Sequence, residues 1–168
     1  MKLSKLKEVP FQIAQVLVEN ENIVRLLYCD NSSVLTTQEQ VSVGINELIE
    51  QNYIGFYPAT ETGISNIERN TFIIINLEDV NLHNSDSNVG ASGAIYITTD
   101  KAHCTLDGGK LRLLELADEI DTTLDGQKLS VAGQLRLNSI NYVVFSDFRS
   151  GYRINFRIYD QQARKAEL

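Results

Sequence analysis

Over the first fifty residues, hydrophobic and polar positions recur with the spacing of short helices. Pro10 suits the first turn of a helix, and the apolar residues from Phe11 to Val18 follow it with mixed helical spacing. Asn20 can cap a second short helix, and a third is predicted from Ile45 to Glu50. The N-terminal part of the chain is therefore predicted to be helical, in short pieces.

From Tyr53 onward the pattern changes to apolar runs and strict alternation, which are typical of strands. Two polar stretches, 59–70 and 81–92, have no sustained period and are predicted to be long exposed loops. The strands are predicted at Tyr53–Tyr57, Thr71–Leu77, Ala94–Thr99, Leu129–Leu137, Tyr142–Phe145 and Tyr152–Tyr159.

The clearest helical pattern extends from Lys110 to Thr122. Its apolar residues fall on one stripe, which consists of Leu113, Leu116, Ala117, Ile120 and Leu124. Similar Thr-Leu-Asp-Gly turns at 105–108 and 123–126 bracket it. The pattern as a whole predicts an α+β fold: a mainly antiparallel sheet packed by one long amphipathic helix, with short N-terminal helices. A single domain over 1–168 is expected, with a polar C-terminal tail at about 160–168.

Composition narrows the class of protein. Hydrophobic residues make up 43% of the 168 residues, which is enough for a core, and the formal net charge is -7. That acidity argues against a specific nucleic-acid binder but is compatible with DNA that passes by without being bound. Cys29 and Cys104 are too few for a disulfide framework, so a reducing compartment is expected. The chain has no signal-peptide pattern, and no apolar run approaches the ~20 residues of a membrane span.

Residues suited to nucleophilic catalysis are scarce. His83 and His103 are the only histidines, and His103 beside Cys104 is the best candidate pair. Neighbouring residues tend to point apart, so an ordinary position at the end of a strand is the better interpretation. His83 lies in a polar loop, where a solvated side chain is expected. We therefore predict no catalytic residues and no enzymatic activity.

Motifs for metals and phosphates are also missing. Asp86 near His83 could chelate weakly, but polar loops contain such pairs by chance. Gly90–Gly93 leads into a predicted strand, and Gly108–Lys110 lacks the other residues of a phosphate loop. The carboxylates of the long helix are expected on its solvated face; they are Glu115, Asp118, Glu119 and Asp121. We predict no metal site and no cofactor.

In the order of its elements, the chain resembles the tail-terminator (tail-completion) and related neck proteins of tailed bacteriophages. The segment 124–135 adds to the likeness. The other matching segments are Ile23–Tyr28, Tyr53–Pro58, Phe72–Leu77, Leu111–Asp121 and Gly151–Ile158. The resemblance implies a small structural subunit of the virion that forms a ring at the head-proximal end of the tail.

Several expectations follow from that resemblance. The subunit would form a closed homo-oligomeric ring, with a hexamer favoured, through contacts made by 59–70, 81–92 and 160–168. Its partners would be the tail tube or sheath protein and the head–tail connector, with no membrane involved. It would be made in the host bacterial cytoplasm and reside in the virion neck or tail. Two alternatives stay open: another connector component (a head-completion ring or tail adaptor), and a small ligand-binding or enzymatic α+β domain without a recognisable site.

Overall fold

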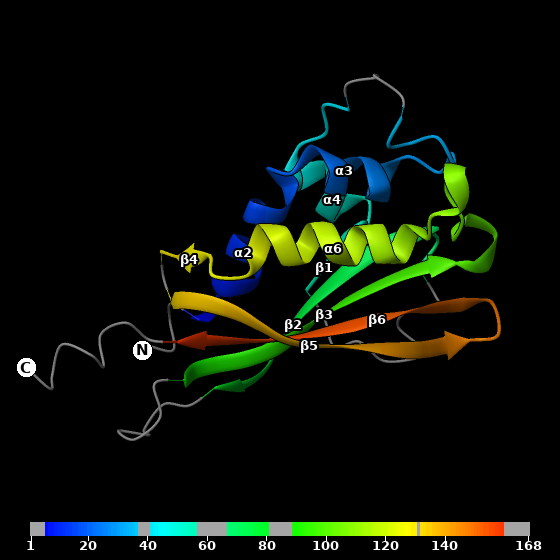
Figure 1. Ribbon diagram of the computed structural model, residues 1–168. Helices are drawn as coiled ribbons and strands as arrows, with labels where there is room; N and C mark the ends of the chain where they lie inside the picture. The colour runs from blue at the N-terminus through cyan, green and yellow to red at the C-terminus, as the bar shows by residue number, and fades with distance from the viewer. Residues whose placement is uncertain (1–5, 37–40, 57–66, 81–88, 131, 160–168) are drawn as a thin grey trace, which may run out of the picture.

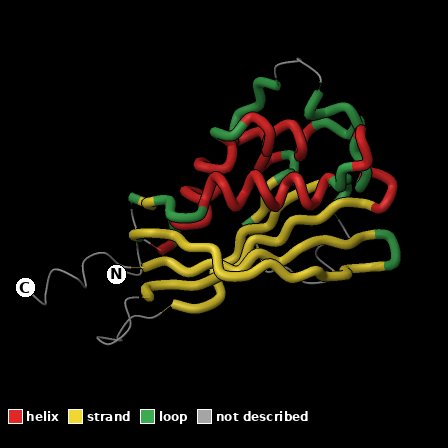
Figure 2. The backbone as a smooth tube through the Cα atoms, in the orientation of Figure 1, coloured by secondary structure: helices red, strands yellow, loops and turns green. Residues whose placement is uncertain are grey.

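Helices cover one face of a six-stranded sheet in the computed structural model, which describes residues 6–36, 41–56, 67–80, 89–130 and 132–159 (Figures 1 and 2). The described strands are β1 (Ile54–Gly55), β2 (Thr71–Val80), β3 (Val89–Asp100), β4 (Lys128–Leu129), β5 (Gly133–Ser146) and β6 (Arg149–Tyr159). The helices are α2 (Val9–Val18), α3 (Glu21–Tyr28), α4 (Ile45–Glu50) and α6 (Arg112–Leu124), with 3-10 turns η1 (Lys101–His103) and η2 (Asp107–Gly109). The α+β class is confirmed.

The sheet is mixed, in the order β1-β2-β3-β6-β5-β4. Only β1 runs parallel to its neighbour among the described pairs, and every other pair is antiparallel. A row of isoleucines crosses four strands in register: Ile75 pairs with Ile95, Ile95 with Ile154, and Ile154 with Ile140. Residues directly opposite each other point to the same side of a sheet, so this row marks the face that meets the helices.

The main core lies between that face and the helices. The apolar stripe expected for α6 is buried, with Leu116, Ile120 and Leu124 fully inaccessible. Asn20 caps α3 as predicted, because its side chain accepts a hydrogen bond of 3.0 Å from the backbone N–H of Asn22. The expectation that one long helix packs the sheet is not confirmed, since α2, α3 and α4 share the core with α6.

Two predicted strands near the C-terminus are one in the structure. The sequence pattern predicts a break over 138–141, but β5 is continuous from Gly133 to Ser146, with a register shift at Leu137/Ser139 in its pairing with β6. A bulge of this kind keeps a strand paired through polar residues that break the alternation. Ser130 and Ala132 instead lie in turns between β4 and β5. The predicted strand Leu129–Leu137 is therefore interrupted: Leu129 belongs to β4, and the strand resumes as β5 at Gly133.

The loop predicted over 81–92 is also corrected at its end. β3 begins at Val89, and Ala91 is fully buried between β2 and β6. Small residues such as Ala91 and Gly93 obscure strand alternation in the sequence, yet here they let neighbouring groups approach closely. A Cβ atom on Gly93 would collide with the carbonyl of Asn76 and the ring of Phe156. Residues 81–88 lie outside the described residues, as do 59–66 of the other predicted loop.

Candidate interaction surface

Two buried arginines hold together the elements that carry the exposed surface. Arg112, at the first turn of α6, is 1% exposed and donates four hydrogen bonds to backbone carbonyls. The acceptors are Leu26 at 2.8 Å, Cys29 at 2.7 Å, Asn31 at 2.8 Å and His103 at 3.0 Å. Carbonyls at the end of a helix lack partners within it, so Arg112 completes the C-terminus of α3. It thereby ties the start of α6 to α3.

Burial has an electrostatic cost at Arg112. Desolvation lowers the pKa of its guanidinium from the usual value, and the nearby Asp30 carboxylate partly offsets that effect. The four carbonyl dipoles compensate for lost water, which is how a buried cation without a close ion pair is tolerated. Sequence reasoning missed this residue, because an arginine next to an amphipathic stripe normally belongs to the solvated face.

Arg149 has the corresponding role at the start of β6. Its Nε donates to Asp100 Oδ1 at 2.7 Å, and its Nη atoms donate to the carbonyls of Ile67 and Arg69 at 3.1 and 2.9 Å. The guanidinium also lies over the ring of Phe72, 5.0 Å from the centroid. Residues 67–69 are therefore part of the folded frame. Residues 67–70 of the predicted loop 59–70 are irregular as expected, but Ile67, Arg69 and Asn70 are half-buried.

The most unusual surface feature is an apolar row on β5. Ile140, Tyr142 and Val144 are 48%, 59% and 66% exposed, although they point to the same side of the sheet as the buried isoleucine row. Tyr142 packs edge-on against Tyr152 of β6, with ring centroids 5.6 Å apart. We call these three residues the β5 row. The apolar residues at 140, 142 and 144 are visible in the sequence, but nothing there shows that the helices leave them uncovered.

A groove joins the β5 row to α6. It has a volume of about 400 Å³ and is lined on the helix side by Leu114, Ala117, Asp118 and Asp121, and on the strand side by 137–140 and Ile154. Leu114 is 46% exposed, so the helix contributes apolar surface as well as two exposed carboxylates. The lining contains no cation. This groove is thus apolar at its base and acidic along one rim.

The outer edge of β5 is open beyond its first residues. β4 pairs only with Gly133 and Gln134, and Asp125 then caps the backbone N–H of Leu137 at 3.0 Å. From 138 to 146, no other strand in the described part of the chain pairs with this edge. An unpaired edge beside exposed apolar side chains is a template for another strand.

The residues singled out as chemical candidates are not brought together as a catalytic group. His103 Nε2 lies 3.4 Å from Asn70 Nδ2, while Nδ1 is buried without a partner among the described residues. The Cys104 thiol donates instead to the carbonyl of Lys101 at 3.0 Å. His83 and Asp86 lie outside the described residues. Gly90–Gly93 is part of β3, and Gly108–Gly109 belong to η2, so neither precedes a phosphate-binding helix directly.

The four carboxylates of α6 divide into two pairs. Glu115 bonds to Lys110 at 3.0 Å, and Glu119 accepts from Asn20 and Asn22 at 2.7 and 2.8 Å, so both serve the fold. Asp118 and Asp121 instead line the groove. Across the described residues, no three His, Cys, Asp or Glu side chains gather as metal ligands. None of the described helices is long and apolar enough to cross a membrane.

The fold and this surface define an α+β protein with an exposed strand edge suited to binding another polypeptide. Residues 20–158 match the model of the YomW family, so the chain belongs to the YomW family. This family is phage-derived, which makes the chain a phage-associated protein. The matched residues extend from the cap of α3 to the end of β6 and include α6 and β5. No curated protein matches the sequence.

Proposed function

We propose that the protein is a structural subunit of a phage virion that forms a ring at the head-proximal end of the tail. There it would cap the tail tube and join it to the head connector, as the resemblance to tail-terminator proteins implies. Membership of a phage-derived family supports a role in the phage. The observation that carries the proposal is the β5 row beside an open strand edge.

Exposed apolar side chains in register are unfavourable on a free monomer. Each fully buried side chain of this size contributes ~1.5–3 kcal/mol relative to exposure, and contiguous exposed patches usually mark interfaces. Here three such side chains follow one another along a strand whose backbone is also open. A partner strand added to this edge would form hydrogen bonds with the open backbone groups and would also bury the apolar side chains.

The position of the row favours head-to-tail association. β5 and β4 form one edge of the sheet, and β1 forms the opposite edge. If the β5 edge of one subunit meets a different surface of its neighbour, the contact is heterologous, and such contacts close into rings when the rotation permits. A six-fold ring is the favoured form. The segments 59–70, 81–92 and 160–168 are also proposed to contact neighbours, and 59–66, 81–88 and 160–168 lie outside the described residues.

The proposed partners and location follow from the proposed role at the end of the tail. The ring would contact the tail tube or sheath protein on one side and the head–tail connector on the other, in the virion neck. DNA would pass through without specific binding, in keeping with the formal net charge of -7. Synthesis would take place in the host cytoplasm. These partners and this location are implied by the resemblance, and they depend on the proposed ring.

Removal of the gene from the phage, with complementation in trans, tests the role. Without the protein, we expect heads and tails that remain unjoined and tails of irregular length, and wild-type protein should restore joined particles. Tyr142→Lys should fail to restore them, whereas Lys128→Ala, an exposed change on β4, should succeed. Normal tails with heads that lose DNA would instead indicate a head-completion ring. Normal infectious particles without the gene would contradict both virion roles.

A further inference from the structure

One segment of this chain has a positive charge that complements the acidic groove beside the open edge of β5. Residues 1–5 read Met-Lys-Leu-Ser-Lys, and Lys7 follows before the first carboxylate, Glu8. This local excess of positive charge stands at the start of a chain whose formal net charge is -7. The groove beside β5 has the opposite character, because Asp118 and Asp121 line it and no cation does.

The alternation of the segment also matches the β5 row. In a strand, residues i, i+2 and i+4 share one face, which would place Met1, Leu3 and Lys5 together. In an antiparallel register, Met1 would lie beside Val144 and Leu3 beside Tyr142. Lys5 would then come next to Ile140, where Asp118 and Asp121 line the groove. In this single register, the apolar side chains of the segment would contact those of the β5 row, and Lys5 would lie near two carboxylates.

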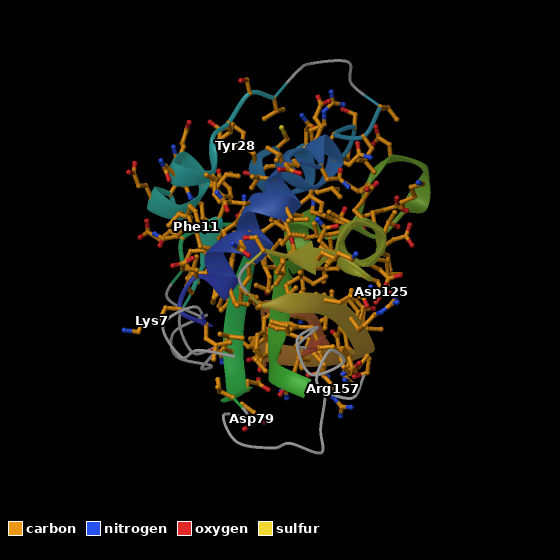
Figure 3. All side chains as sticks on the ribbon, turned by 90° about the vertical axis from the view of Figure 1, so that its left-hand side faces the viewer. Lys7, Phe11, Tyr28, Asp79, Asp125 and Arg157 are labelled. Carbon is orange, nitrogen blue, oxygen red and sulfur yellow. The ribbon has the colours of Figure 1, made fainter. Side chains whose placement is uncertain are left out.

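Lys7, the labelled residue nearest to the segment, lies on the flank opposite the β5 edge of its own chain. Figure 3 looks onto the left-hand side of the view in Figure 1, and it shows Lys7 on one flank and Asp125 on the opposite flank. Asp125 caps Leu137, so its flank is that of the β5 edge. Tyr142 lies a further nine residues beyond Gly133 along β5, about 30 Å of strand. Five residues extend at most about 18 Å.

We infer that residues 1–5 of one copy add as an antiparallel strand to the β5 edge of a neighbouring copy. Lys7, next to the donor segment, and the acceptor edge lie on opposite flanks of each subunit, so the exchange would be head to tail and could continue around a ring. This inference rests on the proposed ring and names the contact that holds it. Main-chain hydrogen bonds to the open edge give affinity, and the pairing of Lys5 with Asp118 and Asp121 sets the register.

Cysteine cross-linking between two protein populations tests the register. One population carries Leu3→Cys and the other Tyr142→Cys, both in a Cys29→Ser, Cys104→Ser background whose folding is verified by circular dichroism. On mixing and mild oxidation, we expect a disulfide-linked dimer that contains one chain of each kind. The matched control replaces Leu3→Cys by Ser4→Cys, whose side chain would point to the other face, and should cross-link at least fivefold less. Equal yields from positions 3 and 4, or no cross-link from either, would overturn the inference.

Charge exchange tests the groove independently. Lys5→Glu and the pair Asp118→Lys, Asp121→Lys should each weaken self-association at least tenfold in sedimentation velocity, at unchanged thermal stability. Lys5→Glu protein mixed with the doubly substituted protein should recover association to within threefold of wild type. Unchanged association in either variant, or no recovery on mixing, would overturn the inference. Mass spectrometry of purified particles separates this from the proposed function: a subunit that remains in the virion after loss of residues 2–5 supports the virion role and refutes the exchange.

Discussion

Ile140 and Ile154 lie directly opposite each other on β5 and β6, yet Ile154 is 4% exposed and Ile140 is 48% exposed. The boundary of the helical layer therefore passes between two neighbouring strands. Inside it, the isoleucine row is core, and outside it the same row continues as surface. One part of this sheet face is therefore buried in the core, and the neighbouring part is exposed and is the surface that we propose for contact with a partner.

The burial of α6 predicts a large effect from truncation of its stripe. Leu116 is fully buried, so Leu116→Ala should lower the free energy of unfolding by about 2–5 kcal/mol through lost contacts and a cavity. Leu114→Ala is the matched control, because Leu114 is 46% exposed, and it should change stability by less than about 0.5 kcal/mol. Urea denaturation followed by circular dichroism measures both. Equal effects would place the stripe on the wrong face of the helix.

Loss of the Arg112 guanidinium should be as severe as loss of a core side chain. Arg112→Met fills similar volume but leaves four carbonyls without their donor, and we expect a loss of about 3–5 kcal/mol. Arg136→Met removes an exposed ion pair with Asp125 and should cost at most about 1 kcal/mol. Thermal unfolding of the two variants gives the comparison. An Arg112→Met protein as stable as wild type would show that the carbonyls find other donors.

The close contact of β6 with β3 predicts that Gly151 tolerates no side chain. A Cβ atom there would collide with the carbonyl of Ile97 and approach Thr98 Cα to 3.0 Å. Because both obstacles are backbone, Gly151→Ala should destabilise the fold by about 1–3 kcal/mol or more. A methyl group on Gly44 would meet nothing within 4 Å, so Gly44→Ala should be nearly neutral. A neutral Gly151→Ala would mean that the two strands separate more easily than their pairing indicates.

No chemical role is assigned to the histidines or to Cys104, and this can be tested in the phage. Replacement of His83 and His103 by Ala and of Cys104 by Ser should leave particle assembly and infectivity unchanged. Plaque titre, with circular dichroism of the purified variant as the folding control, provides the measurement. Lost infectivity in a variant that folds and still assembles into particles would reveal chemistry at one of these residues.

How far the sequence predicts the fold depends on how local each signal is. Alternation and caps are local, which is why α3 with its Asn20 cap, α4 and the stripe of α6 are predicted close to their observed bounds. Burial by distant elements is not local. Arg112 is buried because α3 ends above it, and Ile140 is exposed because no described helix covers it. Both are properties of the packed layers, so the candidate surface could not be predicted from sequence patterns alone.

Reconstruction of the phage neck by electron cryomicroscopy tests the central claim most directly. We predict that this subunit forms a closed ring at the head-proximal end of the tail, with the β5 row of every copy covered by its neighbour. A particle that lacks the subunit, or a subunit present there as a monomer with the β5 row facing solvent, would contradict the account.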